Sequence, residues 1–240
     1  MKRMTIFATV ILALCAALVL AAAPAALLNP DQALERLKSG NARFVQAKLT
    51  HPNQDAFRRL STGQEGQKPF ATILGCSDSR VPPELVFDTG LGDLFVVRVA
   101  GNSTYFDQAG TIEYGAEHLG SQLVVVLGHT KCGAVQAVVD GAQEGGNIAG
   151  LVANIVPAVQ KARLENPGLS GDELVTKAVE ANAWQSVEDL FRQSPLIRHM
   201  VQEGKVKVVA AVYDIETGQV KWLGQHPRQA ELLALDTGPK

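Results

Sequence analysis

Hydrophobic residues along this chain gather in short continuous runs that alternate with stretches of helical periodicity. Four runs rich in Val, Leu and Ile are too short for helices, and such runs are typical of strands covered on both faces, as in a parallel sheet. A fifth run follows a turn-forming Glu-Thr-Gly sequence and is expected to pair back antiparallel with the strand before it. The five predicted strands are residues 70–74, 94–99, 123–127, 206–213 and 220–223.

The stretches between these runs carry apolar residues at helical spacing. Residues 29–45 are predicted to form an amphipathic helix, because Asn29 can cap it and Pro30 suits its first turn, with a break expected near Gly40. Residues 62–67 are Gly-rich and are expected to form a linker. Further helices are predicted at 54–60, at 107–119 and from 134 to about 200, the last interrupted at 166–168.

This order of elements predicts an α/β fold in a single domain, residues 26–240. Strands that alternate with helical crossovers give a mainly parallel sheet, here of about four strands with an antiparallel edge strand, and helices on both faces. The amphipathic helix at 29–45 precedes the first strand as an N-terminal helical arm. The sequence contains no internal repeat.

Residues 1–25 have the composition of a secretory leader. Lys2 and Arg3 precede an uncharged apolar run, residues 6–23, and an Ala-Pro-Ala sequence ending at residue 25 fits a cleavage signal. About 18 apolar residues is also the lower limit for spanning a bilayer, so an uncleaved membrane anchor is the alternative. Both interpretations predict a periplasmic or secreted domain, and cleavage of the signal peptide would leave no membrane partner.

Composition narrows the classes of function. The 240-residue chain has 46% hydrophobic and 19% charged residues and a formal net charge of −2, so it can bury enough apolar surface to fold, which excludes a disordered protein. Lys and Arg form no run, and the chain therefore lacks the basic footprint of a nucleic-acid-binding protein. We expect no nucleic-acid partner.

Two clusters of polar residues fall just past the carboxyl ends of predicted parallel strands, where ligand sites of open α/β sheets lie. The first is Cys76-Ser-Asp78-Ser-Arg80, and the second is His129-Thr-Lys-Cys132-Gly. Two cysteines in an oxidising compartment most simply form a disulfide, but a disulfide would leave the imidazole and the carboxylate unexplained. Two thiolates, an imidazole and a carboxylate suit tetrahedral zinc and disfavour magnesium or calcium.

These residues resemble the β-class carbonic anhydrases. The resemblance rests on the run from Cys76 to Pro82, followed by His129-x-x-Cys132-Gly133. Both halves occur in order, each at the end of a predicted strand. Matching residues flank them over most of the chain outside the leader: Gly40-Asn41-x-Arg43-Phe44, Gln67, Phe95-Val96-Val97-Arg98, Ala100-x-Asn102 and Ile112-Glu113-Tyr114.

The resemblance implies one Zn²⁺ per chain, held by Cys76, His129 and Cys132, with the fourth position shared between Asp78 and water. It implies reversible hydration of carbon dioxide to bicarbonate and a proton by a zinc-bound hydroxide, since an open position on zinc lowers the pKa of bound water to about 7. Asp78 and Arg80 are the catalytic residues of this prediction. Asp78 is expected to leave the metal when Arg80 holds it in a charge-assisted pair.

The resemblance also assigns substrate-binding roles. It implies that Gln67 binds substrate through its amide, that Phe95 and Tyr114 wall the carbon dioxide pocket, and that Gly133 offers its backbone N–H to the bound anion. Simpler alternatives are a solvated linker amide, ordinary aromatic packing and a tight turn, respectively. His118 is a candidate proton relay, whereas His51, His199 and His226 are interpreted as surface or packing residues.

Assembly and regulation follow from the same resemblance. It implies a homodimer or larger homo-oligomer in which a neighbouring subunit completes the active site and residues 29–45 wrap the partner. One branch of the family carries Trp three residues before the first ligand Cys, as part of an inhibitory bicarbonate site. Ile73 stands there, so we expect no cooperative inhibition by bicarbonate, although Arg98 and Tyr114 match that site.

Two other functions stay open at this point. The first is hydrolysis of carbonyl sulfide or carbon disulfide on the same scaffold, which pocket shape would decide. The second is a non-catalytic zinc or redox module, in which Asp78 closes the zinc site permanently or Cys76 and Cys132 oxidise.

Overall fold

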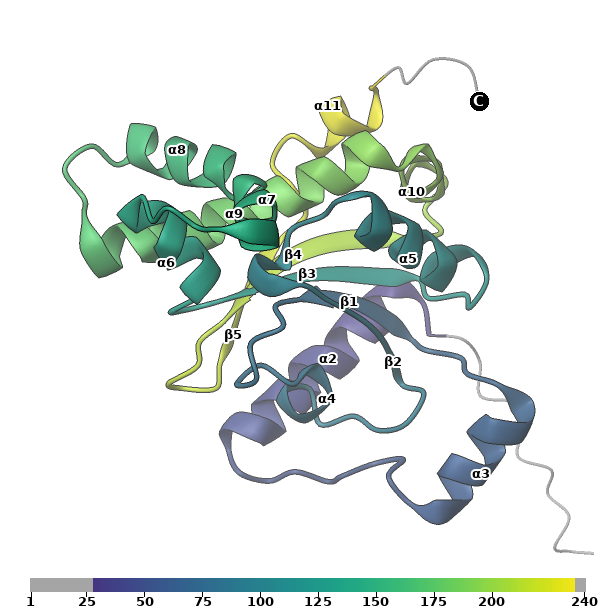
Figure 1. Ribbon diagram of the computed structural model, residues 1–240. Coiled ribbons are helices and arrows are strands. Elements are labelled where there is room, and N and C mark those ends of the chain that lie inside the picture. The colour runs from purple at the N-terminus through teal and green to yellow at the C-terminus, as the bar shows by residue number, and fades with distance from the viewer. Residues whose placement is uncertain (1–27, 236–240) are drawn as a thin grey trace, which may run out of the picture.

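A computed structural model describes residues 28–235, in which a five-stranded sheet carries helices on both faces (Figure 1). The predicted leader, residues 1–25, lies outside the described residues. The sheet order is β2-β1-β3-β4-β5; the first four strands run parallel and β5 is antiparallel to β4, which confirms the predicted fold class. The strands are β1 (Ala71–Gly75), β2 (Leu94–Arg98), β3 (Leu123–His129), β4 (Lys207–Tyr213) and β5 (Val220–Gly224).

Helices cover both faces of the sheet. One face is covered by α2 (Pro30–Val45) and α4 (Pro83–Val86). The other face is covered by α5 (Phe106–Glu117), α9 (Gly171–Gln193), α10 (Pro195–Gln202) and α11 (Gln229–Leu233). The remaining described helices are α3 (Ala56–Glu65), the 3₁₀ helix η1 (Ala100–Asn102), α6 (Gly133–Asp140), α7 (Gly146–Ala153) and α8 (Val156–Glu165).

Alternate residues of the central strand β3 serve the two faces. Val124 and Val126 pack in the cluster that contains α9, whereas Leu123, Val125 and Leu127 pack in the cluster that contains α2. Every residue of β3 is buried. This two-sided burial is the reason that the strand appears in the sequence as a continuous apolar run.

The N-terminal helix α2 begins as predicted and covers its own sheet. Asn29 Oδ1 accepts a hydrogen bond from the Gln32 N–H at 2.9 Å, and Gln32 Oε1 accepts one from the Asn29 N–H at 3.0 Å. The break expected near Gly40 is wrong. Gly40 instead permits close packing, because a Cβ there would lie 1.8 Å from the carbonyl oxygen of Phe87. Leu37 is fully buried against the sheet, and the expectation that residues 29–45 wrap a partner stays a prediction.

Other boundaries also differ from the prediction. The expected linker 62–67 is helical as far as Glu65 at the end of α3. The long helical region that was predicted after residue 134 has a further break after α6, which ends at Gly141 in the left-handed conformation with φ 69°. Finally, β3 continues to His129, because the pairing with β4 extends to Tyr213. His129 therefore lies in the strand and not past it.

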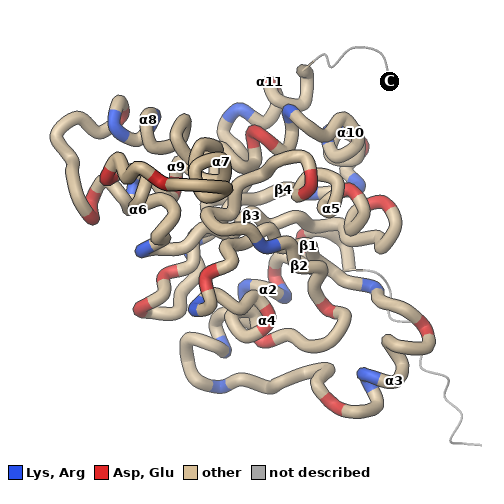
Figure 2. The backbone as a smooth tube through the Cα atoms, viewed as in Figure 1, with Lys and Arg blue, Asp and Glu red and all other residues tan. Residues whose placement is uncertain are grey.

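Charged residues of both signs are interspersed over the described part of the chain (Figure 2). Many form ion pairs, such as Lys131 with Glu216 and Lys221 with Glu180. Exposed pairs of this kind contribute little to stability individually.

Candidate metal centre

Three possible metal ligands meet where β1 and β3 end. Cys76 follows β1, His129 is the last residue of β3, and Cys132 is the N-cap of α6. The two strands are adjacent and parallel, so their carboxyl ends bring the first two residues together. A tight turn through Lys131, which has φ 54°, then delivers the third. The ligand atoms all lie within 4.8 Å of one another, and the three residues are buried.

The imidazole of His129 is oriented by the chain that follows it. Nδ1 lies 2.9 Å from the carbonyl oxygen of Thr130, which can only accept, so Nδ1 carries the proton and Nε2 keeps its lone pair. Nε2 is buried and has no hydrogen-bond partner in the described structure. A buried unpaired acceptor is costly, and a metal ion bound there would satisfy it. The ring is thus held in the orientation of a ligand.

The two cysteine sulfurs are free and compete for ionisation. The Cys132 thiol beside Cys76 lowers the pKa of Cys76 to about 4, against the effect of burial. The backbone amides of Gly101 and Asp78, at 3.3 and 3.4 Å from the sulfur, act in the same direction. The neighbouring Cys76 sulfur and burial raise the pKa of Cys132. A divalent cation would allow both sulfurs to ionise, so this donor set fits zinc.

Asp78 lies beside this group and is held by Arg80. Arg80 Nε donates to Asp78 Oδ1 at 2.9 Å, and Nη2 donates to Oδ2 at 2.7 Å. These bonds are the largest cause that lowers the pKa of Asp78 to about 2. Asp78 Oδ2 is also 3.9 Å from His129 Nε2. The carboxylate therefore stands next to the metal position while it is paired with the guanidinium.

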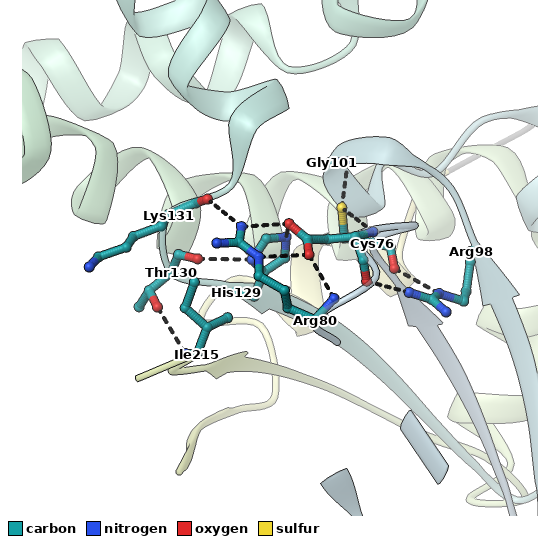
Figure 3. A network of polar contacts seen from close by, with 9 residues as sticks. Cys76, Arg80, Arg98, Gly101, His129, Thr130, Lys131 and Ile215 are labelled. Atoms are coloured by element: carbon teal, nitrogen blue, oxygen red, sulfur yellow. Dashed lines mark hydrogen bonds and ion pairs between the residues drawn. The ribbon is translucent and has the colours of Figure 1, made fainter. Parts of the chain in front are cut away.

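Arg98, to which the sequence assigned no role at the metal, fastens the segment that carries Cys76 and Asp78. Its Nε donates to the carbonyl oxygen of Cys76 at 2.8 Å, and its Nη2 donates to that of Asp78 at 2.6 Å (Figure 3). Arg98 ends β2 and pairs with Gly75, the residue before Cys76. Arg98 could have been identified from the sequence, because it is a basic residue at the end of the strand next to the one that leads to Cys76.

The predicted substrate-binding residues do not all gather at this centre. Gly133 lies beside it, as the first residue of α6 after Cys132. Phe95 stands near the start of β2 and pairs with the start of β1, and its ring centroid is 6.0 Å from that of Tyr114. Gln67 is exposed and precedes β1. Within one chain, these last three residues therefore lie toward the opposite end of the strands from Cys76, and their roles stay predictions.

The histidines outside the centre have other surroundings. His118, the candidate relay, lies with its ring centroid 5.1 Å from that of Tyr114 and pairs with Glu117 at 3.5 Å. His226 is buried with its ring edge-on to Trp184 at 5.4 Å. No described contact connects His118 to the three cysteine and histidine ligands, so its relay role stays a prediction.

Comparisons with known proteins agree with this geometry. A model of the family "Carbonic anhydrase" matches residues 71–220, which include all three possible ligands. Carbonic anhydrase 2 of Mycobacterium tuberculosis strain H37Rv is 38% identical over 195 residues, covering 80% of this chain and 91% of that protein. The carbonic anhydrase of Mycolicibacterium smegmatis is 40% identical over 196 residues, covering 80% and 93%.

Solved structures extend the comparison to the fold. A β-carbonic anhydrase of Aspergillus fumigatus has a TM-score of 0.67 at 28% identity, covering 85% of this chain and 94% of that one. One of two tetrameric β-carbonic anhydrases of Sordaria macrospora has a TM-score of 0.64 at 27% identity, covering 78% and 94%. Because the family match spans more than half of the sequence and these folds align over most of it, the chain belongs to the β-class carbonic anhydrases.

Proposed function

We propose that this chain is a zinc enzyme that catalyses the reversible hydration of carbon dioxide to bicarbonate and a proton. The observation that carries the proposal is the group of Cys76, His129 and Cys132, whose donor atoms lie within 4.8 Å and include an unpartnered buried Nε2. When bound, zinc supplies a Lewis acid that lowers the pKa of water to about 7, so that a nucleophile forms near neutral pH. The names of the relatives support this substrate.

The chain's own residues divide the remaining tasks. Arg80 holds the Asp78 carboxylate in a two-bond pair, so this carboxylate would not compete with water for a metal held by Cys76, His129 and Cys132. Asp78 retains acceptor capacity there and can orient that water through its proton. Apolar residues of α6, α8 and α9 pack around the two cysteines and exclude bulk water from that side, among them Val135, Val159 and Val175.

Metal and thiol assays test the proposal directly. Purified protein should hold about one zinc per chain, expose no reactive thiol until a chelator is added, and hydrate carbon dioxide in a stopped-flow assay. Metal-free protein with a Cys76–Cys132 disulfide would contradict it and favour the redox module. Carbonyl sulfide is assayed as an alternative substrate. Hydrolysis of carbonyl sulfide without hydration of carbon dioxide would show that the chain is a hydrolase of the sulfur analogues.

We also propose that the working form is a homodimer or larger assembly in which a second copy supplies Gln67, Phe95 and Tyr114 to the metal. These residues are remote from the metal ligands of their own chain. Apolar side chains also remain uncovered, since α3 has no buried residue and Phe57 and Phe106 are 78% and 76% exposed. The tetrameric relatives from Sordaria macrospora support an assembly.

A mixing experiment tests this sharing of residues. Cys132→Ala lacks a metal ligand but keeps Gln67, whereas Gln67→Ala keeps the metal ligands. If the amide acts on the partner's metal, coexpressed hybrids regain activity at one of the two sites of each dimer, although each variant alone is impaired. Hybrids that form but stay as inactive as the separate variants would place Gln67 in its own chain's site.

We propose a periplasmic or secreted location, supported by the charged start and apolar run of residues 1–25. The described residues contain no helix of the length and apolarity that crossing a membrane requires. N-terminal sequencing of exported protein should find a start near Ala26. Retention of residues 1–25 would refute cleavage and support the membrane anchor.

A further inference from the structure

The sulfur of Cys76 is contacted by a backbone amide from a strained loop. The Gly101 N–H in η1 donates to Cys76 Sγ at 3.3 Å (Figure 3). Gly101 has φ 75° and the next residue, Asn102, has φ 45°, so two consecutive residues are left-handed. A Cβ at Gly101 would lie 2.5 Å from Ile155 Cδ1. Non-glycine residues in this region cost about 1 kcal/mol or more, so the loop needs support from its surroundings.

Helix α9 supplies that support through hydrogen bonds to the loop. Asn182 Nδ2 donates to the carbonyl oxygen of Gly101 at 2.7 Å, and Asn182 is 1% exposed. Three residues further along the loop, Thr104 Oγ1 donates to the carbonyl oxygen of Ser186 at 2.8 Å. Both hydrogen bonds connect the same loop to α9. Of the two, only the bond from Asn182 is made to Gly101, the residue whose amide contacts the Cys76 sulfur.

We propose that Asn182 is a positioning residue for the metal centre: it holds Gly101 so that the Gly101 amide stays against Cys76 Sγ. The side chain fixes the carbonyl of Gly101 on the helix side, and the N–H of the same residue then points to the sulfur. This amide fixes where the Cys76 sulfur lies and stabilises the negative charge of the thiolate by hydrogen bonding. The inference rests on the proposed zinc site.

The hydrogen bonding of Asn182 separates this role from plain stabilisation. Its Oδ1 is buried and has no partner in the described structure, which by itself disfavours the folded state. Asn182→Leu removes this unpaired atom and leaves another one, the Gly101 carbonyl oxygen, whose described hydrogen bond comes from Asn182. The number of unpaired buried atoms is therefore unchanged, and the substitution should affect the loop far more than the stability of the whole chain.

Amide exchange and zinc release test the role on the full chain. Exchange of the Gly101 amide is followed by NMR in metal-free and zinc-loaded protein, and zinc transfer to a chelator is timed separately. Asn182→Leu and the smaller Asn182→Ala are expected to exchange the Gly101 amide at least about tenfold faster. Loss of a partner behind a metal ligand typically costs about 10–100-fold in metal affinity, so zinc release should accelerate within that range.

The control is Thr104→Val, which removes the second bond between the loop and α9 and keeps a similar volume. It should leave Gly101 exchange and zinc release within about twofold of wild type. Unchanged Gly101 exchange in both Asn182 variants, or equal acceleration in Thr104→Val, would overturn the inference. Failure of the wild type to bind zinc would refute the proposed function instead, and Gly101 exchange in the metal-free variants would still decide the role of Asn182.

Discussion

Replacement of Arg80 by alanine should impair catalysis while the fold and the metal ligands stay in place. The substitution removes both side-chain bonds to Asp78, at 2.9 and 2.7 Å, and a third bond to the carbonyl oxygen of Lys131 at 3.2 Å. The carboxylate, whose Oδ2 lies only 3.9 Å from His129 Nε2, is then free to bind the metal in place of water.

The size of the effect follows from the exposure of the pair. A hydrogen bond to a charged group shifts an equilibrium on the order of tenfold or more. The Arg80 side chain is 52% exposed, so solvent weakens its bonds, and we assign about tenfold to the two together. The expected result is a kcat/KM about tenfold below wild type. The melting temperature should fall by no more than about 4 °C, because an exposed pair contributes little to a chain of this size.

Stopped-flow carbon dioxide hydration, zinc content and thermal unfolding are the three measurements. Arg192→Ala is the matched control, since Arg192 is 51% exposed and donates two side-chain bonds to Glu188 on α9. It should change the melting temperature by a similar amount and leave kcat/KM at the wild-type value. If zinc-loaded Arg80→Ala keeps kcat/KM within about twofold of wild type, the pair is an ordinary surface salt bridge and Asp78 has no gating role.

Three further outcomes are expected. Cys132→Ala should lose zinc and activity together; full zinc content with normal activity in this variant would disprove the ligand set. Bicarbonate should not inhibit cooperatively, because Ile73 is a fully buried core residue and Arg98 donates to two backbone carbonyls; sigmoidal loss of activity at fixed pH and ionic strength would show otherwise. Burial opposes the lowered pKa of Asp88, but Arg43 and neighbouring N–H groups hold it well below its usual range. The ionised Asp88 therefore stabilises the folded chain fully above about pH 4, and this stabilisation is lost as the pH falls further. Asp88→Asn should lower the free energy of unfolding by about 3 kcal/mol at pH 7, and in denaturant titrations the stability of the variant should depend less on acid pH.

The sheet and the meeting of Cys76, His129 and Cys132 could be predicted because both depend on local patterns. Burial on two faces makes β3 continuously apolar, His129 ends that strand, and Cys132 comes three residues later. The parallel arrangement then requires Cys76 to meet them at the same edge. Neither conclusion needs knowledge of a particular side-chain contact.

The errors arise where tertiary contacts decide the local structure. Gly40 suggests a helix break in the sequence, yet its missing side chain is used for close approach to Phe87. Asn182 in the middle of a long helix gives no signal, because its role depends on a loop 81 positions away in sequence. The resemblance names Phe95 and Tyr114 for the pocket. Only the register of β1 with β2, which places Phe95, and the contact of the Tyr114 ring with Phe95 show that both lie away from Cys76 of their own chain.

The formal charges of the centre explain why Arg80 and not Arg98 is expected to control it. Two thiolates match the two positive charges of a zinc ion, so Asp78 adds one uncompensated negative charge. Arg80 is paired with that carboxylate, whereas Arg98 donates to the carbonyl oxygens of Cys76 and Asp78. With zinc bound, the charges of the metal, the two thiolates, Asp78 and Arg80 would cancel, so loss of Arg80 would leave one more negative charge beside the metal. Removing Arg80 therefore changes both the position of Asp78 and the charge beside the metal, whereas removing Arg98 would loosen the segment that carries Cys76.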